Sequence, residues 1–112
     1  MPVIVDLKTC NDLDSFEFDA RKFLYGIQLA FYKKIFLCSI YDEFKTDIAI
    51  PPKVFMVSVE KKPPFRCGVF GVSDSTLEHF SAKLDVALES LKACQNDGKF
   101  PTLYESLRTL NL

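Results

Sequence analysis

The apolar residues change their spacing several times along the chain, and the first block predicts a β-strand. Val3, Ile4 and Val5 are β-branched and stand in a row, so a strand is predicted over Met1–Thr9. An uninterrupted apolar run of this kind is typical of a strand that is covered on both faces. The run therefore predicts a strand with both faces covered, although no segment before it in the given sequence is available to cover a face, and one edge of the strand is expected to have unpaired backbone groups.

A helical stripe comes next along the chain. Its apolar residues recur every three or four positions, at Phe16, Ala20, Phe23, Leu24, Ile27, Phe31 and Ile35. Ser15 is a candidate N-cap, and the pattern ends near Ile40. The span is long for one helix, so a short helix followed by a longer one fits it as well. Gly26 then marks either a kink or a close approach to the sheet.

The second half begins with a polar loop, predicted over Tyr41–Lys53, and then returns to strand spacing. Val54–Glu60 is rich in apolar strand-forming residues and predicts a second strand. The proline-containing segment Lys61–Phe65 predicts a turn, and Arg66–Val72 predicts a third strand, antiparallel to the second.

The last predicted helix has apolar residues at helical spacing, namely Leu77, Phe80, Leu84, Leu88 and Leu91. Ser75, followed three residues later by Glu78, is a candidate capping box, and Gly98 is a typical residue for the helix end. Lys99–Leu112 is predicted to be a tail with a helical turn around Tyr104–Leu110.

These patterns together predict an α/β chain of the α+β type, with a small mixed sheet of about three strands and helices packed on it. At 112 residues, the chain fits a single domain over residues 1–112. Its apolar share of 48% and charged share of 26% are ordinary for a globular protein. No apolar run approaches the roughly 20 residues of a membrane span, and no secretory signal is recognisable. We therefore expect a soluble, cytoplasmic protein that makes no contact with a membrane.

The net charge of −1 gives no general support for nucleic-acid binding. Such contacts would have to come from the local clusters Lys33–Lys34 or Lys61, Lys62 and Arg66, each of which is equally well explained as solvated surface. The four cysteines stand far apart without a CxxC pair, so the sequence predicts no zinc site.

The candidate chemistry lies in the first strand and the helix after it. Residues two apart in a strand point to the same face, so Asp6 and Lys8 are predicted to project together. A carboxylate beside an ammonium group can hold a divalent metal and polarise a phosphate. Tyr25, Gln28 and Tyr32 are spaced by three and four residues, so they share one face of the helix. Because these polar groups lie next to a core, we expect Asp6, Lys8, Gln28 and Tyr32 to cluster in one partly open concavity. The alternative is that the helix face is only a polar side exposed to solvent.

Four features make the chain resemble the PD-(D/E)xK nuclease superfamily and, within it, the RecE-like (exodeoxyribonuclease VIII) exonucleases of phages and prophages. The segment DLKT at residues 6–9 resembles the (D/E)xK strand motif followed by threonine. In the helix YGIQLAFY, Gln28 and Tyr32 are similar to the QxxxY pattern of RecB-like nucleases. The block VFMVSVEKKPPFRCGVF and the helix end CQNDGKFP resemble later segments of the family.

The resemblance implies roles for these residues. Asp6 and Lys8 would be catalytic, and the Asp6 carboxylate and the Leu7 carbonyl would bind Mg²⁺ or Mn²⁺. Lys8 would orient the attacking water or neutralise developing charge. Four residues would contact DNA or support the site: Thr9, Tyr25, Gln28 and Tyr32. Glu60 either supports the site or is a surface charge at a strand end, and the second interpretation is favoured.

The chain departs from the family in one respect. The family has a further metal-binding aspartate roughly ten residues before the DxK motif, whereas Asp6 is preceded here by five residues. The resemblance therefore implies a restriction-endonuclease-like core that lacks its N-terminal part. The chain is then a truncated nuclease, a protein whose site is completed by a partner or a second copy, or one that has lost catalysis.

The function implied is a Mg²⁺-dependent DNA exonuclease-type domain for phage or prophage recombination, weakly active or inactive alone. Weak DNA binding, assembly into a homo-oligomer and a single-strand annealing partner are also implied. One alternative is a catalytically dead derivative that binds DNA or a recombination or defence protein. Another is an α/β domain in which the DLK sequence is coincidental.

Overall fold

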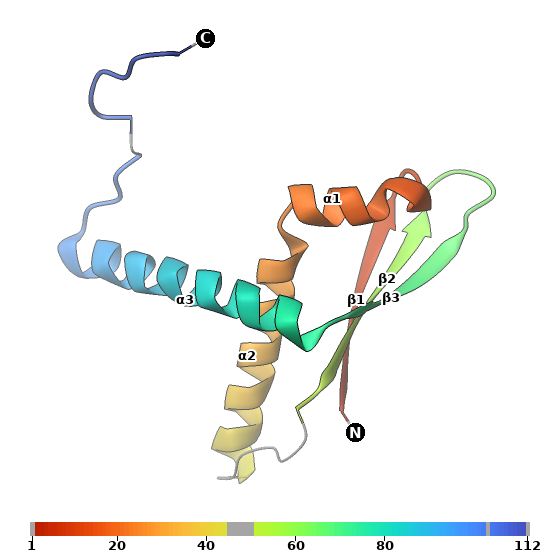
Figure 1. Cartoon of the computed structure of the whole chain (residues 1–112). Helices are drawn as coiled ribbons and strands as arrows, with labels where there is room; N and C mark the ends of the chain where they lie inside the picture. Colours follow the sequence, from red (N-terminus) through yellow and green to blue (C-terminus); the bar gives the residue numbers. More distant parts are fainter. Residues whose placement is uncertain (1, 45–50, 103, 112) are drawn as a thin grey trace.

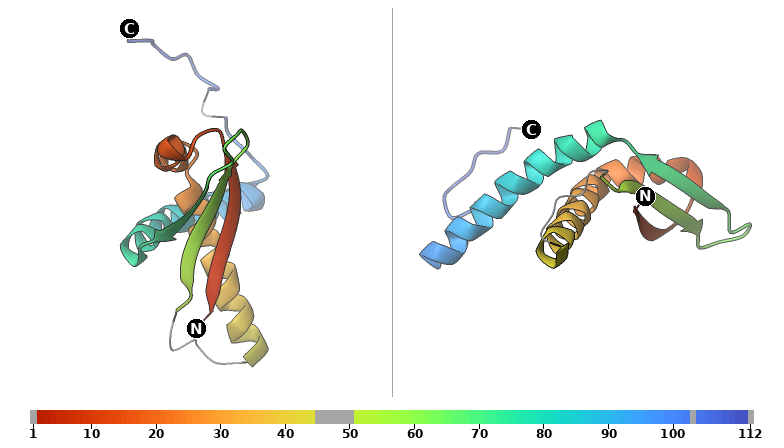
Figure 2. Two further views of the ribbon diagram at one scale, coloured as in Figure 1. Left: turned by 90° about the vertical axis from the view of Figure 1, so that its right-hand side faces the viewer. Right: turned by 90° about the horizontal axis from the view of Figure 1, so that it is seen from below.

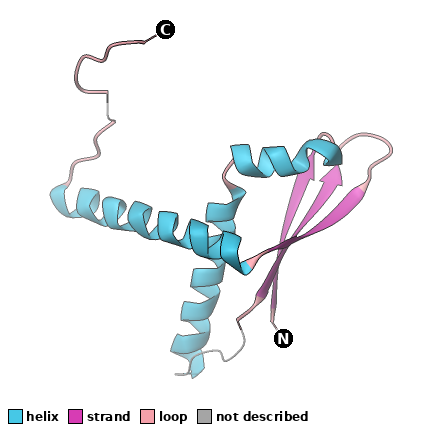
Figure 3. Cartoon of the chain, in the orientation of Figure 1, coloured by secondary structure: helices cyan, strands magenta, loops and turns pink. Residues whose placement is uncertain are grey.

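The computed structural model describes residues 2–44, 51–102 and 104–111 and has a mixed α+β architecture, as predicted. Figure 1 and Figure 3 show its elements in chain order: strand β1 (Val3–Cys10), the short 3₁₀ turn η1 (Leu13–Ser15), helices α1 (Phe16–Lys22) and α2 (Tyr25–Phe44), strands β2 (Lys53–Glu60) and β3 (Cys67–Val72), and helix α3 (Asp74–Asp97). All three predicted strands are present.

The sheet has the order β1-β2-β3, so β1 is an edge strand. β1 runs parallel to β2, because the chain crosses over through α1 and α2 between them. β2 and β3 form the predicted antiparallel pair. The register places Asp6 beside Met56 and Lys8 beside Ser58.

The helical stripe forms two helices, one of the two arrangements that its length allowed. They separate at Leu24, whose φ of 55° is incompatible with helix. α2 continues past Ile40 to Phe44, so the first four residues of the predicted loop, 41–44, are helical; residues 45–50 of that prediction lie outside the described residues. Among the described residues no single helix is long and apolar enough to span a membrane; Leu13–Lys22 and Tyr25–Ile40 reach that length and composition only together, across a 73° bend.

Gly26 allows the close approach predicted for it, but the approach is to α3 and not to the sheet. A β-carbon at this position would collide with the ring of Phe80. The absence of a side chain at Gly26 therefore lets α2 and α3 cross in close contact.

The helices cover one face of the sheet only, as the two views of Figure 2 show. Large side chains from the helices and from the inner sheet face form the core, which contains Cys10, Phe16, Leu29, Val54, Met56 and Leu77. The prediction that β1 is covered on both faces was wrong, since the side chains of Val3 and Val5 are 51% and 58% exposed. Apolar content alone did not distinguish a buried strand from one with an open apolar face.

α3 begins two residues earlier than the predicted capping box implies. Ser73 is the N-cap, and its hydroxyl accepts a hydrogen bond from the Thr76 amide at 3.2 Å, so Ser75 lies inside the helix. Gly98 ends the helix with φ 69°, as predicted. The described residues of the tail after it are not helical, and the predicted turn around Tyr104–Leu110 is absent there.

Glu60 is buried at the end of β2, so the prediction of a surface charge was wrong. Its carboxylate accepts hydrogen bonds from the Leu13 amide at 3.1 Å, from the Arg66 amide at 2.9 Å and from the Arg66 guanidinium at 2.8 Å. These hydrogen bonds lower the pKa of Glu60 to about 2, and the bond from the Arg66 guanidinium makes the largest contribution. The carboxylate ties η1 and the β2–β3 turn to the sheet.

Acid is therefore expected to destabilise the protein partly through Glu60. Because the folded-state pKa of Glu60 is depressed, this contribution is present above the unfolded pKa of 4.5 and is lost as the pH falls towards 2. Urea unfolding between pH 5 and pH 2 measures it. Glu60→Gln should be less stable than the parent at pH 5, and the difference should shrink on acidification. A difference independent of pH would show that the ionised carboxylate is not the stabilising group.

Candidate functional site

Asp6 and Lys8 project together from β1 towards the helices, as predicted. Lys8 Nζ lies 3.2 Å from Asp6 Oδ2, and the two side chains are 19% and 12% exposed. The contact is an ion pair but not a hydrogen bond, since Asp6 Oδ2 is buried and has no hydrogen-bond partner within the part of the chain that is described. A lone pair of this carboxylate oxygen is therefore available for another ligand.

Helix α2 brings its polar face against Lys8. The ammonium group donates a hydrogen bond to Gln28 Oε1 at 2.7 Å, and Gln28 Nε2 donates to the Tyr32 hydroxyl at 2.7 Å. Lys8 Nζ also lies 4.7 Å from the centre of the Tyr25 ring. The predicted cluster of Asp6, Lys8, Gln28 and Tyr32 is present, and Tyr25 belongs to it.

This chain of contacts borders an open hollow of about 660 Å³ between β1 and α2. Apolar residues make up much of its lining: Phe23, Leu24, Ile27 and Phe31 stand beside Lys8, Tyr25, Gln28 and Tyr32. The sequence placed these four apolar residues in the core stripe. They have the spacing of a core face, so the sequence held no signal that they would border a hollow instead.

Leu7 and Thr9 point away from this hollow. Successive side chains of β1 alternate between faces, so both lie on the open face of the sheet, and both are exposed. The Thr9 side chain therefore does not lie beside Asp6 and Lys8, where the resemblance to the nuclease motif had placed it.

The backbone carbonyl of Leu7 nevertheless faces the free edge of the sheet. Lys53 N donates to the carbonyl of Pro2, and Lys61 N donates to that of Cys10, so these even-numbered carbonyls point towards β2. The register between them is unbroken, and carbonyls alternate in direction along a strand. The Leu7 carbonyl therefore points to the edge that no other described strand covers.

The oxygen atoms of Asp6 and of the Leu7 carbonyl are suitable ligands for a hard divalent cation. A carboxylate oxygen and a backbone carbonyl are typical ligands of Mg²⁺, which often takes only one or two protein carboxylates and keeps several waters. Within the described ranges, however, no three His, Cys, Asp or Glu side chains come together in a way that could hold a metal. Asp6 and the Leu7 carbonyl fit part of such a site.

Ser58 is a neighbour of the site that sequence reasoning missed. It is fully buried beside Lys8 in the register, and its hydroxyl has no hydrogen-bond partner among the described residues. Ser58 Oγ and Asp6 Oδ2 are thus two unsatisfied polar atoms on adjacent strands. Unsatisfied buried groups of this kind often mark the place of a water or an ion.

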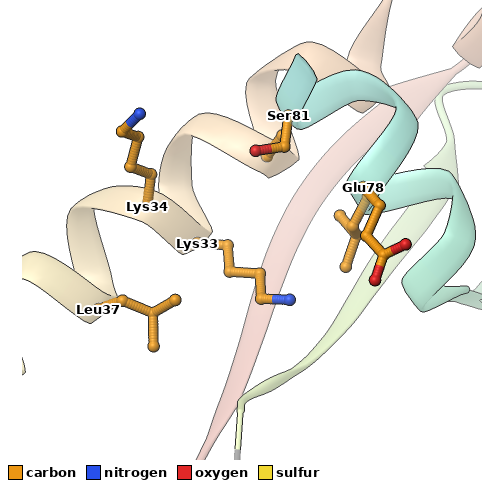
Figure 4. Close-up of a pocket in the computed structure, with 7 residues that line it drawn as sticks. Lys33, Lys34, Leu37, Glu78 and Ser81 are labelled. Atoms are coloured by element: carbon orange, nitrogen blue, oxygen red, sulfur yellow. The ribbon is translucent and has the colours of Figure 1, made fainter. Parts of the chain in front are cut away.

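The basic clusters singled out in the sequence lie elsewhere and are partly neutralised. Lys34 pairs with Asp85 at 2.6 Å, which raises the pKa of Lys34, and Arg66 pairs with Glu60. Lys33 and Lys34 line a separate hollow of about 210 Å³ between α2 and α3 (Figure 4), together with Leu37, Glu78 and Ser81. No residue of the Asp6–Lys8 cluster (Asp6, Lys8, Tyr25, Gln28 and Tyr32) lines this second hollow.

A family model described as a PDDEXK-like domain of unknown function (DUF3799) matches residues 1–110. No curated protein matches the chain.

Proposed function

Because this chain belongs to the family of PDDEXK-like domains, we propose that it is the DNA-cleaving domain of a metal-dependent exonuclease of the RecE-like type. The observation that carries the proposal is the contact chain from Asp6 through Lys8 to Gln28 and Tyr32. It joins the strand motif to the helix motif at one open hollow. Divalent metals are typical of PDDEXK nucleases, so the cofactor proposed is Mg²⁺ or Mn²⁺.

The residues of the chain then have distinct tasks. The Asp6 carboxylate and the Leu7 carbonyl would hold the metal, which when bound supplies an activated water and neutralises phosphate charge. Gln28 accepts a hydrogen bond from Lys8 and so fixes the ammonium group, while the Tyr25 ring lies beside it. A fixed ammonium group stabilises charge that develops on a phosphate better than a mobile one.

Asp6 provides the one carboxylate that forms an ion pair with Lys8 among the described residues. We propose that a second carboxylate comes from outside them, on a preceding segment, a second copy or a partner. Metal placement suffers without it, and a misplacement of about 1 Å can slow a reaction on the order of a hundredfold.

The single carboxylate also favours a second candidate function, in which the domain binds DNA or a recombination protein without cleaving. The net charge of −1 implies that DNA binding by this chain alone is weak and falls quickly as salt rises. A role in phage or prophage recombination, beside a single-strand annealing protein in the cytoplasm, is part of the first proposal.

Release of acid-soluble nucleotides from linear duplex DNA tests the two functions. The 112-residue chain should release little with Mg²⁺. The chain joined to the aspartate-bearing segment that precedes this strand in a PDDEXK nuclease should release far more, and EDTA should stop the release. Equal, negligible release by both forms would overturn the exonuclease proposal and favour the binding function. Strong release by the shorter chain would contradict the need for a second carboxylate.

A further inference from the structure

The sheet face turned away from the helices is apolar and uncovered in the described structure. It carries Val3, Val5, Leu7, Phe55, Val57, Val59 and Val69, and Val69 and Leu7 are each 70% exposed. Lys53 is the one charged side chain of the three strands on this face. A contiguous apolar face of this size is typical of an interaction surface.

The tail after α3 has the opposite property, since it is an apolar segment without a surface to cover. Phe100, Tyr104, Leu107 and Leu110 are all exposed, and the Leu107 side chain is 99% exposed. Leu107 and Leu110 follow Leu103 at positions i+4 and i+7 of the sequence, so a helix over this segment would place the three leucines on one stripe.

The beginning of such a helix already has its capping interactions. The Tyr104 amide donates to the Thr102 hydroxyl at 3.1 Å, and the Thr102 amide donates to the Glu105 carboxylate. This reciprocal pair is a variant of a capping box, in which the hydroxyl accepts from the second residue after the cap instead of the third. Arg108 lies over the Tyr104 ring at 4.8 Å, one helical turn away in sequence. The segment thus has helix-starting contacts, while the described residues that follow are irregular.

The tail cannot cover the open sheet face of its own chain as a helix. α3 starts two residues after β3 and has 24 residues, so it carries the tail about 36 Å from the sheet (Figure 1). Residues 98–101 span at most about 14 Å, and a helix over residues 102–111 adds about 15 Å. The two together are shorter than α3.

We propose that the tail of one copy folds as a helix on the open sheet face of a second copy, and that the exchange is reciprocal. The paired part of the sheet has an area of roughly 300 Å², from about 20 Å of strand and three strands about 4.8 Å apart. Direct contact between two such faces would bury far less than the about 800 Å² per partner of a standard interface. In a reciprocal exchange each copy buries its sheet face and also its tail.

Single substitutions on each surface test the exchange, with sedimentation velocity and circular dichroism as readouts. The parent chain should dimerise, and its helix content should rise with concentration. Leu107→Glu on the tail and Val69→Glu on the sheet should each give monomers, because each buries a charge in the contact. Thr109→Glu places the same charge on the other side of the tail helix and should leave the dimer intact.

Mixing the two monomeric variants gives the decisive outcome. The tail of Val69→Glu and the sheet of Leu107→Glu are both intact, so the mixture should recover association through one of the two contacts. Thermal unfolding shows that each variant is folded. A parent chain that stays monomeric, a dimer insensitive to Leu107→Glu, or a mixture without recovery would each overturn the exchange. The second of these outcomes would indicate direct sheet-to-sheet contact.

Discussion

Lys8→Met is expected to slow Mg²⁺-dependent nucleotide release by the segment-extended protein about 10²- to 10³-fold. Methionine has nearly the same length but no charge, so the phosphate loses the ammonium group that Gln28 holds in place at 2.7 Å. This expected reduction in rate is the one typically seen when a single fixed hydrogen-bond donor is removed from a site where charge develops in the transition state. Initial rates at saturating Mg²⁺ measure the effect.

Lys83→Met is the matched control, because Lys83 lies on α3 and contacts the Phe80 ring instead of the Asp6–Lys8 cluster. Its rate should equal that of the parent. Thermal unfolding checks that Lys8→Met, which leaves the Asp6 carboxylate without its ion pair, is still folded at the assay temperature. A folded Lys8→Met protein with the parental rate would remove Lys8 from the mechanism.

Phe16→Ala is expected to lower the free energy of unfolding by about 3–5 kcal/mol. Phe16 is 2% exposed. The centre of its ring lies 5.0 Å from the centre of the Phe70 ring and 6.2 Å from the centre of the Tyr25 ring. Alanine leaves a cavity between α1 and the sheet that these rings cannot fill. Since small domains are stable by about 5–15 kcal/mol, the loss is a large part of the total. Urea denaturation measures it.

Phe18→Ala is the control for this substitution, because it removes the same ring two positions away on the same helix, where the side chain is 63% exposed. Its effect should stay below about 1 kcal/mol. Similar losses for the two variants would mean that α1 is not packed on the sheet as described.

The parts of the site that follow from local geometry could be predicted from the sequence. A spacing of two residues in a strand places Asp6 and Lys8 on one face of the sheet. A spacing of four residues in a helix places Gln28 and Tyr32 on one face of that helix. The meeting of the two faces was predicted from their polar side chains next to an apolar core, and the resemblance to a known motif supported that prediction. Thr9 was misplaced because the same alternation that unites Asp6 and Lys8 sends the next residue to the opposite face.

The other errors concern tertiary surroundings that local pattern does not encode. The run from Val3 to Val5 has the composition of a buried strand, yet one of its faces is open. Glu60 ends a strand in sequence, but the turn after it folds Arg66 back onto the carboxylate. The unsatisfied Ser58 hydroxyl had no signal in the sequence, because a serine in an apolar strand is ordinary.

Titration of Mg²⁺ in the nucleotide-release assay tests the central claim most directly, because it separates metal binding from the chemical step. Asp6→Asn in the extended protein should raise the Mg²⁺ concentration for half-maximal release at least about tenfold, since it weakens a proposed metal ligand. Lys8→Met should instead lower the maximal rate and leave that concentration unchanged. The claim that Asp6 binds the metal and Lys8 acts on the phosphate would be contradicted if both variants kept the parental curve.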